Sequence, residues 1–121
     1  MTANSISIVD MIPAADSGES QQNSEPSIAV NPSNPLQMVA AAFGGGGALY
    51  FVSTDGGATW SDFGAVPSQD KSIAWAADGS TALTASLEDN KIDTYAMPSP
   101  MVTSGGNFGS RRNMPCSSRA C

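Results

Sequence analysis

Apolar residues along this chain gather in short runs, and turn-forming residues separate one run from the next. Runs of this length are typical of β-strands, because successive side chains of a strand point to opposite faces of a sheet. No long stretch places apolar residues at helical spacing, so we expect little or no helix. The pattern predicts strands at residues 5–12, 25–30, 37–43, 48–53, 59–66, 70–75, 81–87 and 92–96.

Residues 53–60, which read Ser-Thr-Asp-Gly-Gly-Ala-Thr-Trp, form the clearest turn in this pattern. Asp-Gly-Gly between two apolar runs predicts a hairpin, because glycine adopts positive φ without strain and Asp bonds to nearby backbone amides. Ser53 and Thr59 are expected to add side-chain hydrogen bonds to the backbone at the two ends of the turn. The Trp60 ring is expected to cover the turn as an apolar cap.

The positions Ser53, Asp55, Gly57, Thr59 and Trp60 match the pattern Ser-x-Asp-x-Gly-x-Thr-Trp. This pattern resembles the Asp-box, or bacterial neuraminidase repeat (BNR), of sialidase-like β-propellers. In that family the box is the turn between the third and fourth strands of a blade, on the face away from the active site. The resemblance therefore implies a structural role for these five residues, and it bears on the fold more than on the function.

A second unit follows the first at an offset of 45 residues. Residues 70–75 align with residues 25–30, and residues 81–87 and 92–96 take the places of the second and third strands. A period of this length with short strands is typical of propeller blades. We therefore predict an all-β fold, a partial β-propeller of two four-stranded antiparallel blades with the Asp-box hairpin in the first. Trp75 replaces Val30 in this alignment and is expected in the core.

The second unit loses the pattern after residue 98: no Asp-box follows its third strand, and both cysteines appear. Cys116 and Cys121 form either a small disulfide or two free thiols, and without any histidine they are poor evidence for zinc. The predicted organisation is an N-terminal segment with a ring-closing strand and a polar loop (1–23), a first blade (24–68), an incomplete second blade (69–98) and a disordered or aberrant tail (99–121).

The net charge of −6 is unevenly distributed along the chain. All 11 acidic residues lie in residues 1–98 with two lysines, whereas residues 99–121 carry three arginines and no acid. An acidic body argues against nucleic acid as a partner, since non-specific binding needs a basic surface. The sequence also predicts no membrane partner, because no apolar run approaches the roughly 20 residues that cross a bilayer. No signal peptide is visible at the N-terminus.

No catalytic residue carries over from the resemblance. Sialidases hold the substrate carboxylate with three arginines, and they use a Tyr–Glu pair as nucleophile and an Asp as acid/base. The arginines of this chain, Arg111, Arg112 and Arg119, all lie in the tail. Tyr50 and Tyr95 lie within predicted strands without an obvious paired Glu. We predict no metal site and no cofactor.

Glu25 and Asp70 are a pair of carboxylates at equivalent positions of the two units. Each precedes the first strand of its blade, so both are expected near the ring axis, on the face where propellers commonly bind ligands. Such a pair suits acid/base chemistry on a glycoside or a cation or sugar site. The simpler alternative is that each carboxylate caps the start of a strand and meets solvent.

Two blades leave apolar faces uncovered, because repeat units generally need about three or more neighbours for stability. We therefore expect the chain to be part of a longer propeller or to close a ring as a homo-oligomer. The predicted function is a non-catalytic fragment of a sialidase-like propeller with a structural or glycan-interaction role, and a glycan is the predicted ligand. The alternatives are the N-terminal part of an exo-α-sialidase or other glycoside hydrolase with its catalytic residues in further blades, and a self-assembling lectin-like module. Whether the chain belongs to an enzyme stays open, and the resemblance implies an extracellular or periplasmic location.

Overall fold

The computed structural model describes residues 7–11, 24–44, 47–68, 70–98 and 109–115. Every regular element within these ranges is a β-strand, which confirms the predicted all-β class. The strands are β1 (Ser24–Val30), β2 (Met38–Gly44), β3 (Gly47–Ser53), β4 (Ser61–Val66), β5 (Asp70–Trp75), β6 (Thr81–Glu88), β7 (Lys91–Pro98) and β8 (Gly109–Pro115). Strands β1 to β7 coincide with predicted strands, shifted at their ends by a residue or two.

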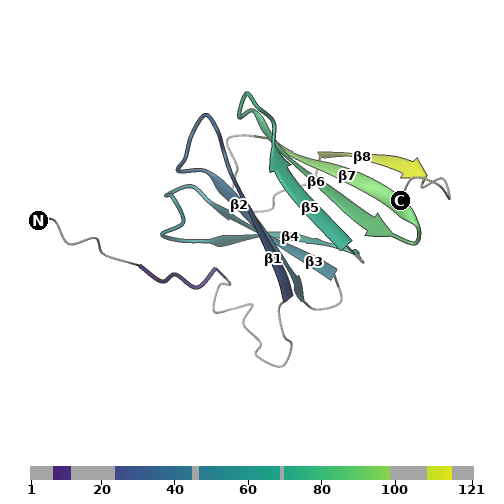
Figure 1. Ribbon diagram of the computed structural model, residues 1–121, viewed down its shortest axis with the longest axis horizontal. Helices are drawn as coiled ribbons and strands as arrows, with labels where there is room; N and C mark the ends of the chain where they lie inside the picture. The colour runs from purple at the N-terminus through teal and green to yellow at the C-terminus, as the bar shows by residue number, and fades with distance from the viewer. Residues whose placement is uncertain (1–6, 12–23, 45–46, 69, 99–108, 116–121) are drawn as a thin grey trace, which may run out of the picture.

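The strands form two antiparallel sheets (Figure 1). The first sheet has the order β1-β2-β3-β4 and the second sheet has the order β5-β6-β7-β8. In each sheet, strands that follow one another in the chain pair with one another, so the two sheets have the same topology. Each strand of the first sheet therefore has a counterpart at the same place in the second sheet.

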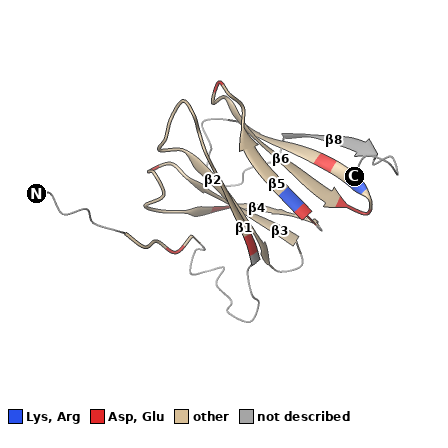
Figure 2. Ribbon diagram, viewed as in Figure 1, with Lys and Arg blue, Asp and Glu red and all other residues tan. Residues whose placement is uncertain are grey.

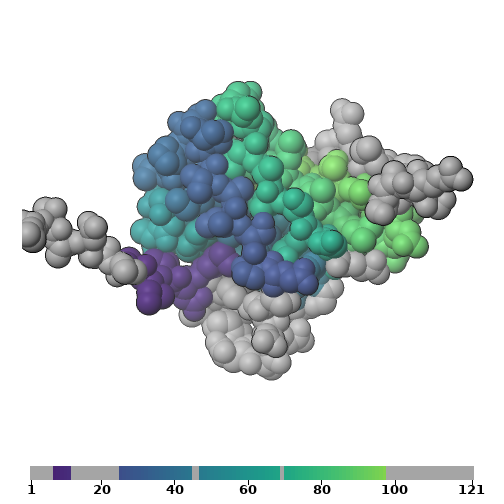
Figure 3. Space-filling model, viewed as in Figure 1, coloured from purple at the N-terminus to yellow at the C-terminus, as the bar shows by residue number. Residues whose placement is uncertain are grey.

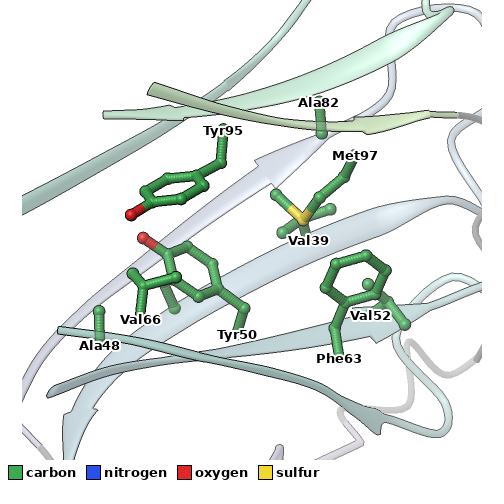
Figure 4. Packing of buried hydrophobic residues seen from close by; sticks show 10 residues of the cluster. Val39, Ala48, Tyr50, Val52, Phe63, Val66, Ala82, Tyr95 and Met97 are labelled. Carbon is green, nitrogen blue, oxygen red and sulfur yellow. The ribbon is translucent and has the colours of Figure 1, made fainter. Parts of the chain in front are cut away.

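The hydrophobic core lies between the two sheets, where side chains from facing strands meet (Figure 4). Val39, Tyr50 and Val52 come from the first sheet and Tyr95 and Met97 from the second, and all five are at most 8% exposed. Along β3 and β7 the core residues alternate, as the period of a strand requires. The other members are Ala41, Ala48, Phe63, Val66 and Ala82, with Phe43, Ile73 and Trp75 packed against them. Trp75 thus packs against the core, as predicted, whereas its counterpart Val30 is 47% exposed.

A β-bulge in β4 lets two residues at irregular spacing enter this core. Tyr50 pairs with Gly64 and Phe51 pairs with Asp62, so Phe63 is the extra residue between the two pairs. Gly64 has a φ of 139°, which glycine adopts without strain. In an uninterrupted strand, residues three apart point to opposite faces of the sheet. Because of the bulge, Phe63 and Val66 both face the second sheet.

A group of hydroxyl side chains is buried within the same interface. The Tyr50 hydroxyl lies 2.6 Å from Thr84 Oγ1 and 3.3 Å from Ser86 Oγ. Thr84 Oγ1 in turn donates to the carbonyl oxygen of Ser72 at 2.9 Å. Tyr50, Thr84 and Ser86 are at most 2% exposed, and these bonds compensate for the loss of water.

The N-terminal strand predicted at residues 5–12 is wrong for residues 7–11, which have no regular secondary structure. Ile8 is 95% exposed. Alternating apolar residues give strand propensity, but propensity alone does not hold a strand, because its backbone groups must pair with a neighbouring edge. Residues 5, 6 and 12 lie outside the described residues.

The structure also differs from the prediction near the C-terminus, where residues 109–115 form β8 and pair with β7. We predicted a disordered or aberrant tail from residue 99 and an incomplete second unit, yet the second sheet has four strands. The sequence Gly-Ser-Arg-Arg-Asn-Met-Pro lacks the apolar alternation on which strand prediction depends. An edge strand is held by its backbone hydrogen bonds and does not require that alternation. Residues 99–108 and 116–121, including both cysteines, lie outside the described residues.

Candidate functional site

The 53–60 turn between β3 and β4 is organised by the side chains of Ser53 and Asp55. Ser53 Oγ donates to Asp55 Oδ1 at 2.8 Å and accepts the backbone amide of Gly57 at 2.9 Å. Asp55 Oδ1 accepts the amide of Thr59 at 2.9 Å, and Asp55 Oδ2 accepts the Thr59 hydroxyl at 2.6 Å. The side-chain-to-backbone bond predicted for Ser53 is therefore present, and Thr59 bonds the Asp55 carboxylate through both its amide and its hydroxyl.

The two glycines of this turn provide its backbone geometry. Gly56 and Gly57 have φ values of 75° and 87°, a region that other residues adopt only with strain. Trp60 Nε1 donates to the carbonyl oxygen of Gly57 at 3.1 Å, so its indole folds back over the turn. The amide of Gly56 donates to the carbonyl oxygen of Leu36 at 2.9 Å, which ties the turn to the β1–β2 connection.

These hydrogen bonds stabilise the ionised form of Asp55. The side-chain bond from Thr59, then its amide and the Ser53 hydroxyl, lower the pKa of Asp55 from 3.8 to about 2. A carboxylate that accepts several hydrogen bonds holds its charge more strongly than a free one. The turn therefore depends on an ionised Asp55.

A second cluster lies where β1 and β5 begin. Lys71 Nζ donates to the carbonyl oxygen of Glu25 at 2.8 Å and lies 3.8 Å from the centroid of the Phe43 ring. An ammonium over an aromatic face is attracted by the ring quadrupole. Asp70 precedes Lys71 directly and accepts the Lys71 amide at 2.7 Å. Figure 2 shows the acidic residue of β1 and the charged residues of β5 at the same end of the two strands.

Electrostatics couple the three charged residues of this ligand-face cluster, which we define as Glu25, Asp70 and Lys71. Partial burial lowers the pKa of Lys71, and the charges of Glu25 and Asp70 oppose that shift. Glu25 and Asp70 are both exposed. Glu25 has a φ of 51°, an uncommon value for a residue other than glycine, at an irregularity in the pairing of β1 with β2. The cluster therefore combines two exposed carboxylates with one half-buried ammonium.

Side chains of β5 bond the free edge of β1 along its length. Lys71 reaches the Glu25 carbonyl, and Trp75 Nε1 donates to the Ala29 carbonyl at 3.1 Å. In Figure 3 the residues of β1 and β5 lie side by side on the visible face. Carbonyl groups at a sheet edge need partners when they leave water, and these donors supply them. The bonds therefore fix the two first strands next to each other and position the ligand-face cluster.

The far ends of β1 and β5 are joined through Asn31, which is 2% exposed. Asn31 Nδ2 donates to Gln37 Oε1 at 2.7 Å and to the Gly79 carbonyl at 3.0 Å. Asn31 Oδ1 accepts the amide of Ser33 at 2.8 Å, and Ser33 Oγ donates to the Asp78 carbonyl at 2.9 Å. One buried amide thus closes its own turn and binds the equivalent turn of the second sheet.

The sequence identified some of these residues and missed others. It placed Glu25 and Asp70 at the starts of equivalent strands, and the structure brings both next to Lys71. It did not identify Lys71, Asn31 or Tyr50 as contacts between the sheets. The 45-residue offset contained a signal, because Lys71 and Trp75 each bond a carbonyl 46 residues earlier in the chain.

The remaining sequence predictions concern the tyrosines and arginines, metal binding and membrane spans. Tyr50 and Tyr95 are buried in the core, and β8 contains Arg111 and Arg112. Among the described residues no group of three or more His, Cys, Asp or Glu is placed to hold a metal ion. The same part of the chain contains no helix that is long and apolar enough to cross a membrane.

Comparison of the chain with family models, with curated proteins and with solved structures found no match.

Proposed function

We propose that this chain is a non-catalytic module of an Asp-box, sialidase-like β-propeller, with a structural role and a glycan-binding end. The observation that carries the proposal is the hydrogen-bond network of the 53–60 turn. All five side chains or backbone groups of the Ser-x-Asp-x-Gly-x-Thr-Trp pattern take part in it. A chance match to the pattern would not require Ser53, Asp55 and Thr59 to bond one another.

The arrangement of the two sheets supports a propeller. Blades of a propeller are four-stranded antiparallel sheets that pack face to face, with their first strands nearest the axis. In this chain two sheets of equal topology enclose one core, and β1 and β5 are the strands that lie next to each other. These features agree with two neighbouring blades.

The ligand-face cluster is the site that we propose for a glycan. Sugar hydroxyls donate to carboxylates and accept from an ammonium, so Glu25, Asp70 and Lys71 offer both kinds of partner. The cluster lies at the ends of β1 and β5, which would be the axial end of two blades. Neither carboxylate is buried, so both are accessible to a ligand.

The test is an NMR titration of the chain with N-acetylneuraminic acid and, separately, galactose. We expect at least one sugar to shift the amide signals of residues 25 and 70–71 in a saturable manner. The double variant Glu25→Gln/Asp70→Asn should abolish these shifts. Asp78→Asn is the matched control, because Asp78 is an exposed carboxylate at the opposite end of β5, and it should leave the titration unchanged.

Shifts that persist in the double variant, or that the control removes equally, would contradict a role for the ligand-face cluster. Absence of any saturable shift with either sugar would exclude that cluster as a site for these two sugars. The proposed structural role would then depend only on the hydrogen-bond network of the 53–60 turn.

A further inference from the structure

Two turns of this chain contain the dipeptide Asp-Gly, at residues 55–56 and 78–79. In this dipeptide the backbone nitrogen of glycine can attack the side-chain carboxyl carbon of Asp, because glycine has no Cβ to hinder the approach. An N–C bond forms, the carboxyl OH leaves with the amide proton as water, and a five-membered succinimide results. Water then adds to one of its two carbonyl carbons, which returns Asp or gives isoaspartate. The reaction needs no co-reactant besides water.

In the first of these turns, hydrogen bonds hold both oxygens of the Asp55 carboxylate. Oδ1 accepts the Ser53 hydroxyl and the Thr59 amide, and Oδ2 accepts the Thr59 hydroxyl at 2.6 Å. The attacking nitrogen is held as well, because the Gly56 amide donates to the carbonyl oxygen of Leu36 at 2.9 Å. All of these bonds must break before the carboxyl carbon and the nitrogen can meet. The turn therefore protects Asp55 from this reaction.

The Asp78 carboxylate depends mainly on one neighbour. Its Oδ1 accepts the Ser80 amide at 2.9 Å and the Ser80 hydroxyl at 2.7 Å. These two bonds are the largest causes of the lowered pKa of Asp78. Ser80 is exposed, so water competes for both of its donors. The Asp78 carboxylate is therefore released more easily than that of Asp55.

The backbone of the second turn is restrained by the first sheet. Ser33 Oγ donates to the Asp78 carbonyl oxygen at 2.9 Å, and Asn31 Nδ2 donates to the carbonyl oxygen of the buried Gly79 at 3.0 Å. The Gly79 amide donates to the carbonyl oxygen of Ala76 at 2.9 Å. To reach the carboxyl carbon, the peptide between Asp78 and Gly79 must rotate. That rotation withdraws the Asp78 carbonyl from Ser33, so the contact between the two turns opposes the reaction.

We infer that Asp78 is a site of isoaspartate formation and that its contact with Ser33 controls the rate. Isoaspartate carries the backbone through the side-chain CH₂, so the modified turn is one atom longer. The native turn has no room for that atom, since even a Cβ on Gly79 would lie 2.3 Å from Asn31 Oδ1. The modification therefore separates the two turns that Asn31 joins. The inference goes beyond the proposed function and does not depend on glycan binding.

The experiment is incubation of the purified chain at neutral pH in water labelled with heavy oxygen, because each opening of a succinimide adds one labelled oxygen. Digestion with trypsin in ordinary water separates the two sites, since Asp55 lies in the peptide that ends at Lys71 and Asp78 in the peptide that ends at Lys91. Fragmentation of each peptide in the mass spectrometer locates the label. We expect faster labelling of Asp78 than of Asp55 in the folded protein, and similar rates in urea, where both turns are lost.

Ser33→Ala tests the contact itself, because Ser33 is exposed and the change removes the hydroxyl that donates to the Asp78 carbonyl. Labelling of Asp78 should become about fivefold faster, the factor that corresponds to the loss of one ordinary hydrogen bond, and Asp55 should be unchanged. Thr59→Ala is the matched control. It removes a hydroxyl from the other Asp-Gly turn and should accelerate labelling of Asp55 alone.

Faster labelling of Asp55 than of Asp78 in the folded wild type would overturn the inference, and so would an unchanged rate at Asp78 in Ser33→Ala. Acceleration at both positions in either variant would also overturn it, because unfolding of the whole chain would then control the reaction. Circular dichroism on the same samples establishes that each variant is folded. The comparison of the two positions in the wild type needs no variant, so it decides even if Ser33→Ala does not fold.

Discussion

Asp55 is exposed, yet its carboxylate holds together the turn in which it lies. It accepts the amide and the hydroxyl of Thr59 and the hydroxyl of Ser53, and all three bonds favour the ionised form. The pKa of Asp55 is therefore lowered to about 2, against 3.8 for an unperturbed Asp. At the scale of the residue, the ionisation of the Asp55 carboxyl therefore makes the stability of the turn depend on pH.

The sign of that dependence follows from linkage. Because the pKa in the folded state is lower than in the unfolded state, ionised Asp55 stabilises the fold above about pH 4, and the contribution is lost as the pH falls toward 2. We predict that the difference in melting temperature between the wild type and Asp55→Asn is constant near neutral pH and shrinks over this window. Thermal melts of both proteins across the window measure it. A difference that stays constant down to pH 2 would show that Asp55 does not contribute in this way.

At the scale of the element, strands were easier to predict than the contacts between them. Short apolar runs bounded by Gly, Pro and Asn were enough to locate β1 to β7, because turn chemistry acts locally. The strand predicted near the N-terminus was wrong, because a strand also needs the edge of another strand to pair with. Strand β8 was missed, because its pairing with β7 holds a segment whose sequence is polar. The 53–60 turn was recognisable because the side chains that organise it bond groups within the same eight residues. Lys71 and Asn31 were not, because each donates to a backbone carbonyl of the other half of the molecule.

Gly79 lies at such a contact between elements, in the turn from β5 to β6. Its φ is 71°, and a Cβ at this position would lie 2.3 Å from Asn31 Oδ1 and 2.7 Å from Ser33 Cβ. Gly79→Ala therefore combines backbone strain, about 1–3 kcal/mol for a non-glycine residue in this region, with a clash between the sheets. We predict a clear loss in the free energy of unfolding, measured by urea denaturation.

Gly56→Ala is the matched control for this prediction. Gly56 has a similar φ of 75°, but a Cβ there would meet only Leu36 Cδ2, at 3.4 Å. Backbone strain should be similar in the two variants, so the excess loss in Gly79→Ala reports on the contact with Asn31 and Ser33. Equal losses in the two variants would mean that this contact between the turns contributes little.

At the scale of the whole molecule, two sheets of equal topology pack so that one face of each forms the core. Side-chain donors from β5 join the free edge of β1, and a buried amide joins the two equivalent turns. This packing places the ligand-face cluster at the end where β1 and β5 begin. The sequence repeat predicted that two equivalent units exist. Which faces of the two sheets pack together depends on contacts between residues 45 to 48 positions apart in the chain. The proposed propeller and the proposed glycan site both rest on that packing.

The most direct test of this packing is the nuclear Overhauser effect between the Trp75 indole and β1 in solution. Trp75 Nε1 lies 3.1 Å from the Ala29 carbonyl oxygen, so its proton is close to the backbone of the first sheet. We predict cross-peaks from the Trp75 indole N–H to the protons of Ala29 and Val30. Cross-peaks confined to residues of the second sheet, in a protein that retains its β-sheet spectrum, would show that the two sheets do not stack through β1 and β5.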